Sequence, residues 1–208
     1  MSRERILERI RRATAAVPAS HVEVPRDYQR ATMLTAEATL ALFEERLRDY
    51  DAGVFRVRRA EIAAQAAAVL ARTNRRRLTV PPGLPQAWRP TEGFTWVPDD
   101  AGALSLATLN GVDGVMTAAT VGVAASGSIA LQHGPAEGRR ILTLLPDYQL
   151  CVIEAGQVVE TLPEAFARLD RMRPVTFFSG PSATADIEMT RVKGVHGPRF
   201  LDVLIVMD

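Results

Sequence analysis

Residues able to bind or transform a ligand are densest at positions 180–188, directly after the apolar run 175–178. This segment carries two hydroxyls and two carboxylates, which belong to Ser182, Thr184, Asp186 and Glu188. Alternate residues of an extended segment point to the same side, so the two carboxylates can form a general acid/base pair or a cation site. A polar turn that caps the strand is the alternative, and no distant partner residue decides between them.

Three further groups are candidates to bind an anion. The small residues at 122–128 can form a turn whose backbone amides, around Gly127 and Ser128, hold an anion, although a tight structural turn needs the same residues. Arg139 follows a glycine-flanked loop, and its guanidinium suits a carboxylate or phosphate as well as a surface ion pair. His196 stands between glycines and is either a ligand contact or a structural histidine.

The only cysteine, Cys151, lies in an apolar run at 150–153 and is expected to be buried and inert. An iron–sulfur cluster needs several thiolates, so we expect no such cofactor in this chain. Neither a glycine-rich dinucleotide fingerprint nor a Walker A sequence is present.

Charge and hydropathy narrow the possible partners. The net charge of +1 does not favour nucleic acid, and no apolar run approaches the roughly 20 residues of a membrane span. The N-terminal residues are charged rather than signal-like, so a cytoplasmic location is expected.

The elements that must position these residues alternate along the chain. Helices are predicted over a first amphipathic segment ending before Pro18 and over 35–50, 60–73 and 163–172. Strands are predicted at 54–57, 78–80, 112–117, 128–133, 149–155, 175–179 and 201–207, with 84–100 as an irregular cover.

This order predicts a three-layer α/β fold with a mainly parallel sheet, in which 175–179 and 201–207 are buried strands. Residues 1–33 are expected to be a helix and a mobile polar connector, free to project from the core, and 34–208 a single domain. Strands of one parallel sheet end at the same edge, so Gly127, Ser128, Arg139, the 182–188 segment and His196 are expected to share one cleft. Within it, Asp186 is expected near Arg139 or His196.

The order of the motifs resembles the LUD family, and within it the lactate utilisation proteins of the C type. The motifs are the 122–128 turn, Gly-Pro-x-x-Gly-Arg-Arg at 134–140, Leu-Pro-Asp at 145–147, the 180–188 segment and Gly-x-His-Gly-Pro at 194–198. The resemblance implies a fold like that of the NagB/RpiA/CoA-transferase superfamily. It also implies an accessory role beside two iron–sulfur partner proteins that together oxidise L-lactate to pyruvate, the clusters residing in those partners.

One departure from the family bears on the chemistry. Where the family generally carries acidic residues, this chain has Thr120 and Ala125. Relatives of the CoA-transferase type use a glutamate as nucleophile, so the change favours a binding role over covalent chemistry at this turn. The alternative is a small-molecule enzyme that acts on a carboxylate, a phosphorylated compound or a CoA thioester.

Overall fold

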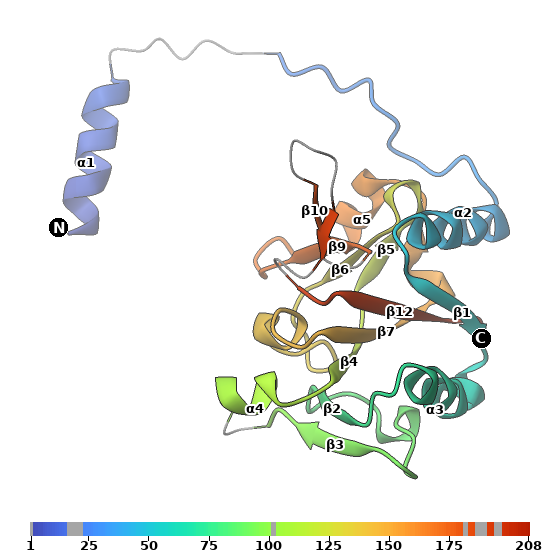
Figure 1. Cartoon of the computed structure of the whole chain (residues 1–208). Coiled ribbons are helices and arrows are strands. Elements are labelled where there is room, and N and C mark those ends of the chain that lie inside the picture. Colours follow the sequence, from blue (N-terminus) through green and yellow to red (C-terminus); the bar gives the residue numbers. More distant parts are fainter. Residues whose placement is uncertain (1, 16–22, 101–102, 181–182, 186–190, 194–196) are drawn as a thin grey trace.

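The computed structural model describes residues 2–15, 23–100, 103–180, 183–185, 191–193 and 197–208. Its largest sheet has six strands in the order β1-β12-β7-β4-β2-β3, and each neighbouring pair is parallel (Figure 1). The strands are β1 (Gly53–Val57), β12 (Phe200–Val206), β7 (Tyr148–Glu154), β4 (Gly114–Ala118), β2 (Arg77–Val80) and β3 (Thr95–Pro98). The predicted α/β fold with a mainly parallel sheet is therefore confirmed.

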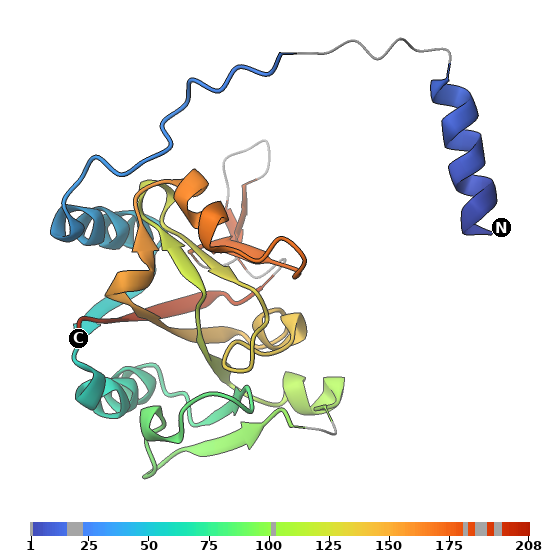
Figure 2. The ribbon, with the colours of Figure 1, turned by 180° about the vertical axis from the view of Figure 1, so that it is seen from behind.

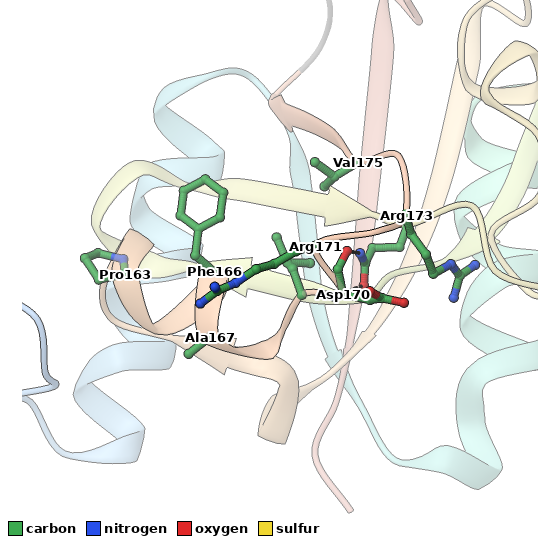
Figure 3. Close-up of a pocket in the computed structure, with 9 residues that line it drawn as sticks. Pro163, Phe166, Ala167, Asp170, Arg171, Arg173 and Val175 are labelled. Atoms are coloured by element: carbon green, nitrogen blue, oxygen red, sulfur yellow. Dashed lines mark hydrogen bonds between the residues drawn. The ribbon is translucent and has the colours of Figure 1, made fainter. Parts of the chain in front are cut away.

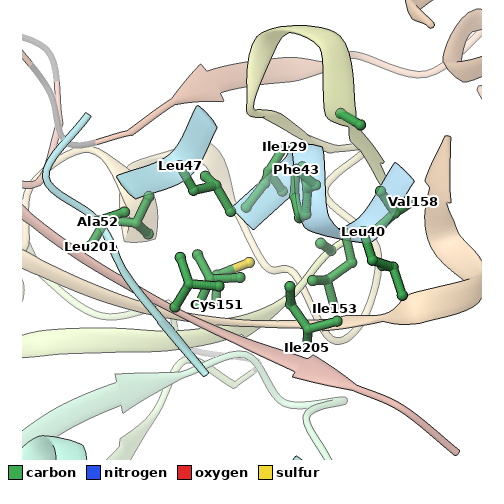
Figure 4. Packing of buried hydrophobic residues seen from close by; sticks show 14 of the residues in the cluster. Leu40, Phe43, Leu47, Ala52, Ile129, Cys151, Ile153, Val158, Leu201 and Ile205 are labelled. Atoms are coloured by element: carbon green, nitrogen blue, oxygen red, sulfur yellow. The ribbon is translucent and has the colours of Figure 1, made fainter. Parts of the chain in front are cut away.

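The two faces of this sheet are covered differently. Helix α3 (Ile62–Arg72) packs an alanine-rich face on one side, where Ile62, Ala66 and Leu70 are fully buried. Helix α2 (Ala36–Asp49) begins at Thr35, whose hydroxyl accepts a hydrogen bond from the Ala38 amide, and lies on the other side. Its buried residues Leu40, Phe43 and Leu47 are spaced by three and four, as expected for one helix face (Figure 4).

A second sheet shares that side with α2. It has four strands in the order β8-β5-β6-β9, namely β8 (Val158–Val159), β5 (Val121–Val123), β6 (Ser128–Leu131) and β9 (Thr176–Ser179). Helix α5 (Leu162–Arg168) covers its outer face, through a small cluster that includes Val121, Ala130 and Ala165 (Figure 2). This sheet was not predicted from the sequence.

The prediction that 175–179 is a buried strand of the parallel sheet is wrong. Strand β9 pairs with β6 in the second sheet, its first three residues are only half-buried, Ser179 is exposed, and Val175 is 39% exposed. The two phenylalanines of this run pack into different cores. Phe178 packs towards α2 and the parallel sheet, whereas Phe177 packs towards α5. The other run predicted to be buried, 201–207, is confirmed as β12 from Leu201 to Val206, whereas Met207 lies beyond the strand and is exposed.

The remaining elements are short or peripheral. They are α1 (Arg3–Thr14), α4 (Leu106–Asn110), β10 (Ala183–Ala185), β11 (Arg191–Lys193) and the 3-10 helices η1 (Arg59–Glu61), η2 (Gln86–Trp88), η3 (Ala124–Ser126), η4 (Arg140–Thr143) and η5 (Ala155–Gln157). No residue of α1 is buried, and both views draw it apart from the sheets (Figures 1 and 2). Within the described ranges, no helix is long and apolar enough to cross a membrane.

Three local predictions need correction. The segment 84–100 is not wholly irregular, because β3 adds an edge strand to the parallel sheet. The helix predicted over 163–172 ends at Arg168. The connector, predicted to be mobile, is held at its C-terminal end by the Glu160 carboxylate. This carboxylate accepts hydrogen bonds from the backbone amides of Met33 and Leu34 and from the side-chain amide of Gln29.

Candidate functional site

The turn at Gly127 and Ser128 is a tightly packed structural turn. Gly127 has a φ of +60°, and a Cβ there would lie 2.7 Å from the Cβ of Arg46 on α2. The Ser128 hydroxyl is 2.7 Å from that of Ser126 and 2.6 Å from that of Ser179, so three hydroxyls satisfy one another. Ser179 ends β9, which places this turn beside the start of the 180–188 segment.

Arg139 is engaged by a carboxylate that sequence reasoning missed. Its Nε and Nη2 atoms each donate to one oxygen of Asp99, both at 2.7 Å, in a bidentate pair. Asp99 directly follows β3 and is buried, and the hydrogen bond from Arg139 lowers the pKa of that carboxyl. The guanidinium edge that could bind an anionic ligand is therefore occupied. The alternative expected for Arg139 was an ion pair at the surface, whereas the carboxylate of this pair is buried.

The loop before Arg139 lies at the carboxyl ends of β2, β3 and β4. The Gly83 amide donates to the Pro135 carbonyl at 2.9 Å, and the Ala118 amide to the Ala136 carbonyl at 2.9 Å. Gly138 adopts a φ of +74° where a Cβ would meet Leu142 at 2.6 Å. A residue with a side chain would be strained there, so the glycine is needed for the loop to lie this close to the sheet.

A buried carboxylate inside the same loop was also missed. Glu137 is 7% exposed and accepts hydrogen bonds from the Thr120 hydroxyl and from the backbone amides of Gln132, at 2.6 Å, and Gly134, at 3.2 Å. The network includes Thr120, one of the two positions where the family generally carries an acid. Glu137 lies within the motif singled out above for its arginines, so its sequence position was a usable signal.

His133 closes the other side of this loop. Its Nδ1 is 3.0 Å from the Gly138 carbonyl, and its Nε2 is 2.9 Å from the Thr176 hydroxyl. A carbonyl only accepts, so Nδ1 carries a proton and donates to Gly138. The histidine thereby ties the loop after β6 to the first residue of β9.

The loops at 134–140 and 180–188 do not follow strands of one parallel sheet, which was the reason to expect a shared cleft. The loop at 134–140 follows β6 and the segment at 180–188 follows β9, but these two strands are antiparallel neighbours. Their carboxyl ends therefore point in opposite directions, unlike those of parallel strands. The Gly127–Ser128 turn lies at the start of β6, beside Ser179, whereas Arg139 lies beyond its end, beside Asp99.

Ser182, Asp186, Glu188 and His196 lie outside the described residues. Thr184 lies in β10, opposite Val192 of β11, within a two-stranded antiparallel sheet. The proximity of Asp186 to Arg139 or His196 stays a prediction.

A pocket of about 520 Å³ lies where α5 and the turn after it face β9 (Figure 3). Its lining combines apolar side chains, a carboxylate and two guanidiniums, and comprises Gln132, Pro163, Phe166, Ala167, Leu169, Asp170, Arg171, Arg173 and Val175. The volume falls within the ~300–1,000 Å³ range of small-molecule sites. Gly134 borders it, since a Cβ there would lie 3.7 Å from Arg173 Nη2.

Cys151 lies in the core between the parallel sheet and α2. Burial raises the pKa of its thiol to about 12, so at neutral pH it is neither a nucleophile nor a ready metal ligand. Among the residues that the structure describes, no three His, Cys, Asp or Glu side chains are grouped to hold a metal ion.

Comparison with known proteins decides the family. A family model for the LUD domain matches residues 106–206. A protein of Deinococcus radiodurans named lactate utilization protein C is 38% identical over 204 residues, which cover 96% of this chain and 94% of that protein. The chain belongs to the LUD domain family. The match begins at α4 and ends with β12. The LUD domain therefore includes the second sheet, the Glu137 loop and the pocket.

Two further relatives fit this assignment. The uncharacterized protein YkgG of Escherichia coli is 38% identical over 98 residues, which cover 43% of this chain and 42% of that protein. A crystal structure of a duf162 family protein from Deinococcus radiodurans is 34% identical, with a TM-score of 0.70, and the match covers 83% of this chain and 99% of that one. At this identity the LUD chain and the solved structure share their fold.

Proposed function

We propose that this LUD chain is an accessory cytoplasmic subunit of a system that oxidises L-lactate to pyruvate. In this proposal two iron–sulfur partner proteins carry the electrons, and this chain supplies no cofactor. The observation that carries the proposal is the 38% identity, across 96% of the chain, to a protein named lactate utilization protein C.

The chemistry of the described residues is consistent with a subunit that leaves electron transfer to others. Its single thiol, Cys151, is buried and held protonated, so it does not offer a thiolate to a cluster. Glu137, the most deeply buried carboxylate in the described loops of the LUD domain, is satisfied by three donors and stabilises its own loop. A group so engaged is poorly suited to attack a substrate.

The test combines growth with recovery of the complex. Deleting the gene should abolish growth on L-lactate but not on pyruvate, and a plasmid copy should restore it. A tagged chain, expressed at its natural level in lactate medium, should be recovered with proteins that contain iron and acid-labile sulfide. Normal growth of the deletion strain on lactate, or recovery of the chain without any iron–sulfur protein, would contradict the proposal.

A further inference from the structure

The pocket between α5 and β9 has an apolar wall and an unneutralised cation. Phe166 and Val175 line it and are 51% and 39% exposed, so the apolar surface is open to a ligand. Phe166 is kept in position from behind by Phe177, whose ring centroid lies 5.8 Å away. Apolar side chains exposed inside a concavity gain free energy when a ligand covers them.

The two arginines of the pocket differ in their surroundings. The side chain of Arg171 extends along Ala167 and Phe166, whereas Arg173 lies at the opposite end, next to Asp170 (Figure 3). Arg173 also faces Gly134, close to the Glu137 carboxylate. Among the described residues, neither guanidinium forms an ion pair or a hydrogen bond. Arg173 lies beside the Asp170 carboxylate and near that of Glu137, whereas Arg171 lies against the apolar wall, so Arg171 is the cation better placed to bind an external anion.

The polar residues beneath the pocket form hydrogen bonds with one another that hold its shape. The side-chain amide of Gln132 donates through Nε2 to the backbone carbonyl of Asp170 at 2.8 Å. Its Oε1 accepts from the backbone amide of Asp170 at 3.1 Å. The Asp170 carboxylate accepts from the Met172 amide at 2.9 Å. These bonds fix the turn that presents Arg171, so the site is formed before any ligand arrives.

We propose that this pocket binds a small monocarboxylate with an apolar body. The carboxylate pairs with Arg171, and the apolar body lies against Phe166 and Val175. A guanidinium binds a carboxylate through charge-assisted hydrogen bonds, and the adjoining apolar wall selects against small polar acids. The inference concerns the isolated chain and does not depend on the proposed lactate-oxidising complex.

The test measures binding to the purified full chain by titration calorimetry. The probes are 3-phenylpropanoate, its neutral counterpart 3-phenylpropan-1-ol, and L-lactate. Saturable binding is expected for the aromatic acid. The alcohol is expected to bind roughly tenfold more weakly, because it loses a charge-assisted hydrogen bond. L-lactate, which lacks the apolar body, is also expected to bind more weakly.

Two variants and a control locate the site. Arg171→Gln should weaken binding of the acid roughly tenfold while leaving binding of the alcohol unchanged. Phe166→Ala should weaken both. Arg9→Gln, at an exposed arginine on α1, should change neither and serves as the matched control. Circular dichroism of each variant verifies that it is folded.

Several outcomes would overturn the inference. These are equal binding of acid and alcohol, equal or tighter binding of L-lactate, the same effect from Arg171→Gln and Arg9→Gln, or no saturable binding of 3-phenylpropanoate.

Discussion

At the scale of single residues, the conformation and packing of Gly127 lead to a prediction about stability. Its φ of +60° disfavours any side chain, and a Cβ would lie 2.7 Å from Arg46 Cβ and 2.9 Å from the Arg46 carbonyl carbon. Gly127→Ala should therefore lower the free energy of unfolding by about 1–2 kcal/mol from the backbone strain alone, and by more if α2 cannot shift. Urea unfolding of the variant and the parent chain measures this difference in the free energy of unfolding.

The chain offers a matched control for this substitution. Gly156 lies in η5, and apart from its two chain neighbours no residue has an atom within 4 Å of the position that a Cβ would occupy there. Gly156→Ala should therefore change the free energy of unfolding by less than about 0.5 kcal/mol. Equal effects at the two positions would show that the Gly127 turn is not packed against α2 as described.

Asp202 makes a second residue-scale prediction, which concerns pH. It lies 6% exposed at the start of β12, where its Oδ2 accepts from the Tyr148 hydroxyl at 2.9 Å. Burial raises the pKa of this carboxyl, against the opposing effect of Tyr148. The folded-state pKa exceeds the unfolded value, so ionising Asp202 reduces stability as the pH rises above about 3.9.

Asp202→Asn removes this charge and keeps the shape of the side chain. At pH 7 the variant should be at least as stable as the parent, and its advantage should disappear below about pH 3, where Asp202 is protonated in both states. Urea unfolding at several pH values measures this, with exposed Asp27→Asn as control. A clear loss of stability at pH 7 would mean that the charge of Asp202 is stabilising, through Arg72 at 3.8 Å.

At the scale of elements, the connector is held to α5 and β8 by carboxylates. The hydrogen bonds from the Leu34 and Met33 amides lower the pKa of the Glu160 carboxyl. The backbone amide and the hydroxyl of Thr32 donate hydrogen bonds to the Glu164 carboxylate. Because the pKa of the Glu160 carboxyl is lowered, its hydrogen bonds to the connector persist at neutral pH. They are lost only when the pH falls through that lowered pKa. The attachment should therefore survive below the ordinary glutamate value of about 4.3.

Amide chemical shifts of Met33 and Leu34 measure this attachment directly. Their titration midpoint should lie below about 4.3 in the parent chain, and Glu160→Gln should abolish the transition. Glu4→Gln on the exposed helix α1 should leave it unchanged. A midpoint at the ordinary glutamate value, or a transition that survives in Glu160→Gln, would show that Glu160 does not hold the connector.

At the scale of the whole molecule, α1 is expected to add nothing to the stability of the core. None of its residues is buried, and its apolar Ile6, Leu7 and Ile10 are each more than a third exposed. Deleting residues 2–22 should change the free energy of unfolding by less than about 0.5 kcal/mol. Deleting residues 2–34 should lower it measurably, because Glu160 and Glu164 lose their connector donors.

Thermal and urea unfolding of the two truncated chains distinguish these cases. A fall of several degrees in the melting temperature after removal of residues 2–22 alone would mean that α1 packs on the fold.

Local patterns were sufficient to determine the main elements of the parallel sheet. Periodic apolar residues at Leu40, Phe43 and Leu47 predicted α2. Nearly continuous apolar runs predicted β7 and β12, because a strand buried on both faces is apolar at most of its positions. The burial of Cys151 followed from the same run. These features depend on neighbours within a few residues along the chain.

Only the tertiary structure decided the direction of β6 and β9 and the arrangement of the site. An apolar run does not reveal which sheet it joins or whether its neighbour is parallel, so β6 and β9 were expected in the parallel sheet although they belong to a separate four-stranded sheet. The Arg139–Asp99 pair joins residues 40 positions apart, and the Arg171 pocket forms only when α5 packs against the second sheet. Such contacts depend on the three-dimensional packing of distant elements, which no local spacing encodes.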